Sequence, residues 1–178
     1  MLLESFKIAL SLIFPLVIAG FLHMFLVKKN LLSSLNKPIS LKMFGRNKTY
    51  RGFVAMPVFT YIGLLYSQAI PFFKNQNLTQ MQLLKLGLLL GLFYALFELP
   101  NSWMKRRLNI EPGKTPDKNK LLFIFIDQAD SVIGCLCVYV LFMDLTFLTI
   151  SLVILLGPSL HLLVNYMLYL FKLRKEPV

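Results

Sequence analysis

The stretch ELPNSWMKRRLNIEPGKTPDKNKLLFIFIDQAD, residues 98–130, joins two apolar segments of the chain. It places Glu98 at the end of the first segment, three basic residues at 105–107 after it, and Asp127 and Asp130 inside the second segment. Charged side chains are expensive in a lipid environment, and where they occur they usually mark a functional site. We therefore interpret this stretch as the functional centre of the chain.

The composition of the whole chain indicates lipid, not water, as its main surrounding. Of its 178 residues 57% are hydrophobic, against roughly 45–50% in soluble proteins, and the mean hydropathy is +0.67. The net charge of +11 would suggest nucleic-acid binding in a soluble protein. Here the basic residues fall between apolar segments, so membrane lipids and phosphate-bearing ligands are the expected partners, and nucleic acid is not.

Five apolar segments approach the roughly 20 residues that a helix needs to cross a bilayer core. We predict an all-α integral membrane bundle of five transmembrane helices, forming a single domain over residues 1–178. The helices are expected at about 6–27, 52–73, 81–99, 121–143 and 147–171, with cytosolic loops at 28–51 and 100–120. The first segment lacks a small-residue cleavage box and is expected to remain as an anchor.

Basic residues alternate strongly between the two ends of these helices. They gather after the first and third helices, and Lys172, Arg174 and Lys175 follow the fifth, whereas the other two connections hold only Lys74. Because cytoplasmic loops carry an excess of Lys and Arg, this pattern predicts an N-terminus outside and a C-terminus in the cytosol. The three carboxylates of the central stretch then lie toward the cytoplasm, in an inner or plasma membrane.

Spacing along the helices predicts which side chains meet. Asp127 and Asp130 are three residues apart and share one helix face, together with Gly134. Small residues recur every four positions before Glu98, a pattern that packs membrane helices closely; they are Gly87, Gly91 and Ala95. Glu98 lies near the same direction and is expected to point into the bundle.

Paired carboxylates beside a cluster of cations suit phosphoryl or nucleotidyl transfer. Two acids can hold one or two divalent ions that neutralise phosphate oxygens, while lysines and arginines bind the remaining charge. Oxygen ligands favour Mg²⁺ over zinc, and the nearby cations suit a triphosphate. His23 and His161 lie singly on apolar segments and, like Asn165, are expected to hydrogen bond neighbouring helices.

Three short motifs follow one another on the predicted cytosolic side. They are Lys48-Thr49-Tyr50-Arg51-Gly52, Ser102-x-x-Lys105-Arg106-Arg107-Leu108-x-Ile110-x-Pro112-Gly113 and Asp127-Gln128-x-Asp130. From about residue 45 to 134 the chain resembles the CDP-archaeol synthase family and its bacterial relatives, and the last motif is similar to the Asp-Arg-x-Asp signature of CDP-diacylglycerol synthases. The resemblance implies a nucleotidyltransferase that uses Mg²⁺, CTP and a lipid phosphate to form a CDP-lipid and pyrophosphate in phospholipid biosynthesis.

The same resemblance implies roles for individual residues. Asp127, Asp130 and Lys105 would be catalytic, and the two acids would ligand the metal. The substrate-binding residues would be Lys48, Thr49, Arg51, Ser102, Arg106 and Arg107. Typical archaeal members carry Gly-Asp ahead of the Ser-x-x-Lys-Arg-Arg element, whereas this chain reads Glu98-Leu99-Pro100-Asn101-Ser102. Glu98 is expected to replace that aspartate as a metal ligand from one turn back.

A second function class stays open on the sequence. A membrane carrier or accessory protein could bind an anionic lipid or ion without transforming it, because acids inside a membrane also mark transport paths. The basic residues at 105–107 also fit the flank of a membrane helix. The lipid, whether phosphatidate or an ether-linked lipid phosphate, and the choice between a monomer and a homodimer are left open as well.

Overall fold

The computed structural model describes residues 1–74, 78–116 and 118–173. Five long helices account for most of them: α1 (Leu2–Lys28), α3 (Tyr50–Ala69), α4 (Gln80–Arg107), α5 (Lys120–Phe142) and α6 (Phe147–Leu170). The short helices η1 (Ser33–Leu35) and α2 (Leu41–Phe44) lie between α1 and α3. All five long helices are apolar and long enough to cross a membrane, which confirms the predicted helical membrane bundle. Arg174 and Lys175 lie outside the described residues.

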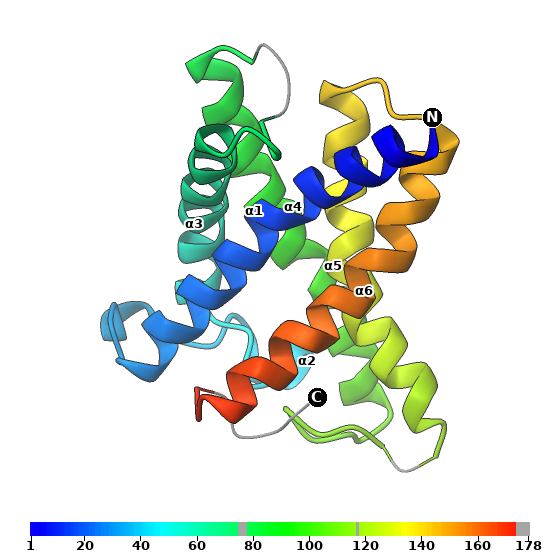
Figure 1. Cartoon of the computed structure of the whole chain (residues 1–178). Helices are drawn as coiled ribbons and strands as arrows, with labels where there is room; N and C mark the ends of the chain where they lie inside the picture. Colours follow the sequence, from blue (N-terminus) through cyan, green and yellow to red (C-terminus); the bar gives the residue numbers. More distant parts are fainter. Residues whose placement is uncertain (75–77, 117, 174–178) are drawn as a thin grey trace.

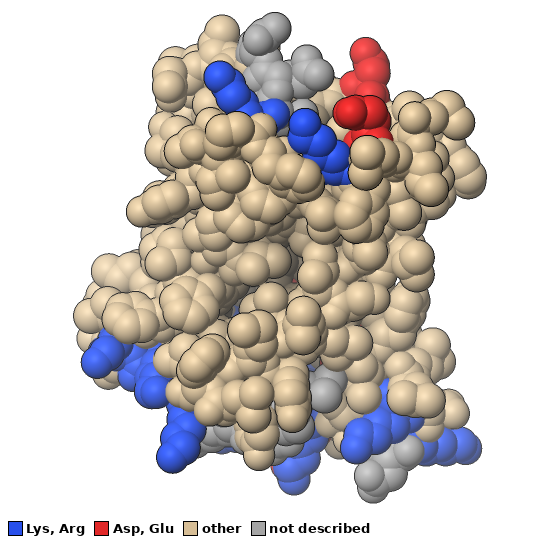
Figure 2. All heavy atoms as spheres, in the orientation of Figure 1, with Lys and Arg blue, Asp and Glu red and all other residues tan. Residues whose placement is uncertain are grey.

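The contacts among the five long helices close into a ring, which Figure 1 shows from the side. Helix α1 packs against α3 and α6, α4 packs against α3 and α5, and α5 packs against α6. Successive helices run in opposite directions, so the loops before α3 and before α5 lie at the same end of the bundle as the end of α6. Lys and Arg side chains gather along this lower end in the view of Figure 2.

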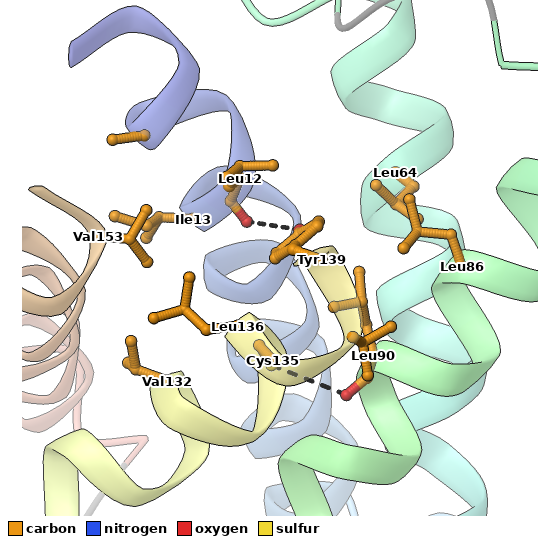
Figure 3. Close-up of a cluster of buried hydrophobic side chains, with 12 residues drawn as sticks. Leu12, Ile13, Leu64, Leu86, Leu90, Val132, Cys135, Leu136, Tyr139 and Val153 are labelled. Atoms are coloured by element: carbon orange, nitrogen blue, oxygen red, sulfur yellow. Dashed lines mark hydrogen bonds between the residues drawn. The ribbon is translucent and has the colours of Figure 1, made fainter. Parts of the chain in front are cut away.

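An apolar core fills the half of the bundle that lies away from the Lys- and Arg-rich end (Figure 3). Tyr139 of α5 is 1% exposed, and its hydroxyl donates to the Leu12 carbonyl of α1 at 2.7 Å. The Cys135 thiol lies 3.8 Å from the Leu90 carbonyl of α4. Because lipid tails are as apolar as these side chains, close packing and such interhelical hydrogen bonds hold the core together.

Glycines allow neighbouring helices to approach closely. A Cβ on Gly87 would lie 2.5 Å from Tyr61 Cα of α3, and one on Gly91 would collide with the Pro57 backbone. A Cβ on Gly134 of α5 would lie 2.7 Å from the Phe97 ring of α4. The small-residue pattern therefore packs α4 against α3, while Gly134 brings α5 against the opposite side of α4.

Helix α4 is longer at its C-terminal end than the sequence pattern indicated. Pro100 lies inside the helix, which continues to Arg107 where an end near residue 99 was expected. A proline is tolerated within membrane helices because neighbouring groups satisfy the backbone hydrogen bond that it removes. Ser102 and the basic residues 105–107, which were expected in a loop over 100–120, are therefore held on a helix.

Candidate active site

A polar network forms where α4 meets α5 in the half of the ring nearer the basic loops. Lys105 Nζ lies 2.5 Å from Asp127 Oδ2. Asn101 Nδ2 lies 2.6 Å from Asp127 Oδ1 and 2.9 Å from Asp130 Oδ2. Asn101 and Lys105 are four residues apart on α4, so they share one face of that helix. This face meets the face of α5 that carries the two acids. Both α4 residues are only 9% exposed.

Asn101 is the member of this network that the sequence analysis did not assign. Its amide nitrogen donates to both carboxylates, while its Oδ1 is buried without a hydrogen-bond partner among the described residues. The spacing of four residues to Lys105 was a signal that both face the same way. A single asparagine on an apolar helix is also common as a helix–helix contact, so that signal was weak.

Lys48 and Thr49 reach the site from the loop before α3. A bridge between Pro38 and Thr49 closes the part of this loop that contains α2, and Ile39 N donates to the Lys48 carbonyl at 2.9 Å. Thr49 caps α3, because its side chain accepts a hydrogen bond from Gly52 N at 3.4 Å. Lys48 Nζ lies 2.5 Å from Glu98 Oε2, which attaches the loop to α4.

Arg51 and Arg106 supply positive charge that is not neutralised by ion pairs within the described residues. Arg51 is 5% exposed, and a terminal nitrogen donates to the Leu31 carbonyl at 3.3 Å. The Nε of each arginine is buried without a hydrogen-bond partner in the described part of the chain. Buried polar groups are nearly always hydrogen-bonded, so these two groups are suited to an anionic ligand.

Arg107 differs from its two basic neighbours. Its guanidinium carbon lies 4.7 Å from the centre of the Trp103 ring, and its side chain is exposed. Successive residues of a helix point about 100° apart, so three adjacent side chains cannot face the same cavity. Lys105 and Arg106 line the cavity and Arg107 does not, in contrast to the substrate contact expected for it.

A cavity of about 800 Å³ connects the charged groups. The expected site residues that line it are Lys48, Thr49, Arg51, Glu98, Ser102, Lys105, Arg106, Asp127 and Asp130. Leu16 and Val17 of α1 and Val164 of α6 belong to its apolar wall. One chamber thus offers cations and acids together with a hydrocarbon surface, which suits a ligand that has both phosphate and lipid parts.

Two uncharged hydrogen bonds join α6 to the helices across the same cavity. The Tyr94 hydroxyl of α4 and His161 Nε2 lie 3.3 Å apart, and Asn165 Nδ2 donates to Gln128 Oε1 of α5 at 3.2 Å. These contacts confirm the interhelical hydrogen bonding expected for His161 and Asn165. All four residues line the cavity, as does His23 of α1.

The oxygen groups beside Asn101 fit Mg²⁺ better than a softer metal. Two carboxylates meet the side chain of Asn101 there, and the amide oxygen of Asn101 is buried with no partner in the described residues. Hard oxygen groups of this kind are the ligands that Mg²⁺ prefers. Glu98 instead pairs with Lys48. The described residues hold no group of three His, Cys, Asp or Glu side chains suited to a metal ion, so the expected set of Glu98, Asp127 and Asp130 is not assembled.

Together the fold and this cavity define an integral membrane protein whose helices enclose a cavity with both charged and apolar walls. The family model described as CarS-like, CDP-archaeol synthase, matches residues 38–177. The chain therefore belongs to the CDP-archaeol synthase family, as the three motifs indicated.

Curated relatives named CDP-archaeol synthase cover 76% of this chain. The relative from Pyrobaculum islandicum is 30% identical over 137 residues, which span 74% of its own length. The relative from Methanospirillum hungatei is 33% identical over 148 residues, spanning 81% of its length, and that from Thermofilum pendens is 33% identical over 138 residues, spanning 59%. No solved structure matches the chain.

Proposed function

We propose that this chain transfers the cytidylyl group of CTP to a lipid phosphate, forming a CDP-activated lipid and pyrophosphate in phospholipid biosynthesis. Membership of the CDP-archaeol synthase family supports the reaction class. At the level of side chains, the observation that carries the proposal is the network of Asn101 and Lys105 with Asp127 and Asp130. This network lines a cavity that also has an apolar wall and two guanidinium groups whose Nε atoms have no hydrogen-bond partner among the described residues.

The reaction needs no nucleophile from the protein. An oxygen of the lipid phosphate attacks the α-phosphorus of CTP and forms a new P–O bond. The bond from the α-phosphorus to the oxygen that bridges to the β-phosphate breaks, and its electron pair leaves on pyrophosphate. Catalysis then consists of holding the two phosphates in line and neutralising their charge.

The side chains of the cavity divide this work. Arg51 and Arg106, whose Nε groups have no protein partner in the described residues, would bind phosphate oxygens. Lys105, held by Asp127, would place a further positive charge beside the acids. Lys48, Thr49 and Ser102 would extend the polar wall around the phosphates. Asp127 and Asp130 would hold Mg²⁺, which when bound neutralises phosphate oxygens.

We further propose that the charged end of the cavity faces the cytoplasm across an inner or plasma membrane. The Lys- and Arg-rich loops lie at this end of the bundle, which is the arrangement of cytoplasmic loops in membrane proteins. The apolar wall would accept the hydrocarbon chains of either an archaeol phosphate or a phosphatidate.

Pyrophosphate release by the purified protein tests the proposed function. The assay contains detergent, Mg²⁺, one nucleoside triphosphate at a time, and a panel of ether-linked and ester-linked lipid phosphates. We expect release with CTP and at least one lipid, and a loss of about 100-fold in Asp130→Asn, the order found when a group that stabilises developing charge is removed. Asp144→Asn, at the opposite end of the bundle, is the matched control and should keep full activity.

Two results would contradict the proposal. One is the absence of pyrophosphate release from a folded protein across the whole panel. The other is lipid binding that does not depend on CTP and is not followed by turnover, which would favour the carrier class.

A further inference from the structure

We propose that Asn101 is a positioning residue that holds Asp127 and Asp130 together as one pair for a divalent cation. The inference rests on the proposed function of the site, because it assigns the two acids to cation binding. Asn101 acts through its amide nitrogen, which contacts a carboxylate oxygen of each acid.

Asn101 is the side chain that the hydrogen bonds of Asp127 and Asp130 have in common. Asp127 Oδ2 is paired with Lys105, and Asp130 Oδ1 accepts from the Ser131 backbone nitrogen at 2.6 Å. The other oxygen of each acid contacts Asn101 Nδ2. An amide nitrogen carries two hydrogens, so a single side chain can donate one to each acid. Asn101 thus links two carboxylates that otherwise have separate partners.

The neutrality of the Asn101 amide matters as much as its two hydrogens. Carboxylates one helical turn apart repel each other, and a donor placed between them reduces that repulsion. Lys105 already balances one of the two negative charges of the acids. A second lysine in place of Asn101 would balance the other and leave no net negative charge on the pair. The uncharged amide of Asn101 brings the acids together and leaves them the negative charge that attracts a divalent cation.

The remaining atom of the amide argues against a purely structural role. Asn101 Oδ1 is buried and has no hydrogen-bond partner within the described residues. An unpaired buried carbonyl destabilises a fold, and buried polar groups that only join helices are usually satisfied. Asn165 is the comparison within this bundle, since it donates to Gln128 and leaves neither of its polar atoms both buried and unpaired.

Binding of Mn²⁺ alone tests the role of Asn101 without any turnover. Free Mn²⁺ is measured by electron paramagnetic resonance with detergent-purified protein, in the absence of nucleotide and lipid. Asn101→Leu removes both donors at similar volume and should weaken Mn²⁺ binding by about 10- to 100-fold, the range for residues that orient metal ligands. Asn101→Gln, which keeps the amide, should recover part of this loss. Asn165→Leu is the control and should bind Mn²⁺ as the unmodified chain does.

Kinetics and stability separate positioning from folding. We expect Asn101→Leu to raise the Mg²⁺ concentration for half-maximal rate while the KM for CTP changes less than about twofold, because in the proposed role Asn101 acts on the cation through the two acids and not on the nucleotide. Melting temperatures are measured for all variants, and Asn101→Ser replaces Asn101→Leu if the latter does not fold. The inference is overturned if these variants bind Mn²⁺ normally, or if Asn165→Leu weakens binding equally.

The same experiments distinguish this inference from the proposed function. If Mn²⁺ binding depends on Asn101 but CTP is not converted, the reaction assignment fails and the positioning role stands. If CTP is converted and the Asn101 variants retain normal Mn²⁺ binding and normal Mg²⁺ dependence, the reaction assignment stands and the positioning role fails.

Discussion

Lys48 Nζ lies 2.5 Å from Glu98 Oε2, although the two residues are 50 positions apart in the chain. The ion pair attaches the loop before α3 to α4, the helix that also carries Lys105. Each side chain is 24% exposed, so the pair is partly screened by its surroundings. Its contribution to stability is therefore expected to lie between that of exposed ion pairs, which contribute little, and that of buried pairs, which are costly to break.

The Lys48–Glu98 pair should contribute measurably to stability. In a double-mutant cycle with Lys48→Met and Glu98→Gln, we expect a coupling free energy of about 1 kcal/mol, the upper end for partly exposed pairs. Unfolding in detergent, followed by circular dichroism, measures it. The Lys114–Glu111 pair, whose side chains are 68% and 69% exposed, serves as the control and should show no measurable coupling. Equal coupling in the two cycles would contradict this expectation.

The neighbouring arginines 106 and 107 should have unequal effects on nucleotide binding. Arg106 lines the cavity, and its Nε has no hydrogen-bond partner among the described residues, whereas Arg107 lies over Trp103 outside the cavity. A hydrogen bond to a charged group contributes about 1.5–3 kcal/mol, so Arg106→Gln should raise the KM for CTP by roughly 10- to 100-fold. Arg107→Gln, with the same change of charge one residue away, should alter it less than about twofold. Similar losses in both variants would show that net charge alone decides binding.

Gly91 should tolerate no side chain where α4 crosses α3. The added Cβ of Gly91→Ala would collide with the backbone at Pro57, and we expect a loss of about 1–3 kcal/mol in unfolding free energy, as for other overpacked sites. Gly20→Ala is the matched control, because beyond its chain neighbours and the nearby backbone of α1 no atom of the described residues lies within 4 Å of its added Cβ. Its melting temperature should stay the same or rise, since alanine favours a helix over glycine. A stable Gly91→Ala variant would mean that α3 and α4 pack less closely.

The proposed orientation of the bundle can be measured with single cysteines. Lys74→Cys lies after α3 and Lys114→Cys lies between α4 and α5, at the opposite end of the bundle. In intact cells, a membrane-impermeant thiol reagent should label the first variant and leave the second unlabelled until the membrane is opened. The unmodified chain, whose Cys135 and Cys137 both lie within α5, reports the background. The reverse labelling pattern would place the site on the outer side.

The helices and the acidic pair were predictable because they depend on local properties. Long apolar runs require a membrane span of nearly fixed length, and a spacing of three residues places Asp127 and Asp130 on one helix face. The end of α4 was not predictable from the same rules. Pro100 is ordinarily a helix-ending signal, and it is only within a packed membrane bundle that the helix can continue past it to Arg107.

The partners of individual polar residues could not be read from spacing. Lys48 was expected beside the phosphates and Glu98 beside the metal. Both line the cavity, and there they form an ion pair with each other that their spacing did not indicate. Arg107 belongs to the same basic cluster as Lys105 but points to Trp103. Such choices depend on how helices are rotated and how far one slides along another, and neither is encoded in a single segment.

The sequence by itself determined that this chain is a five-helix membrane protein, that its acids and cations gather at one end, and which family its motifs resemble. Hydrocarbon thickness and helical periodicity act on each segment separately, so these features do not depend on packing. The tertiary structure alone decided that Asn101 joins Asp127 to Asp130, because that contact exists only when α4 and α5 meet in one register. The closed ring of helices then supplied the cavity in which these groups lie.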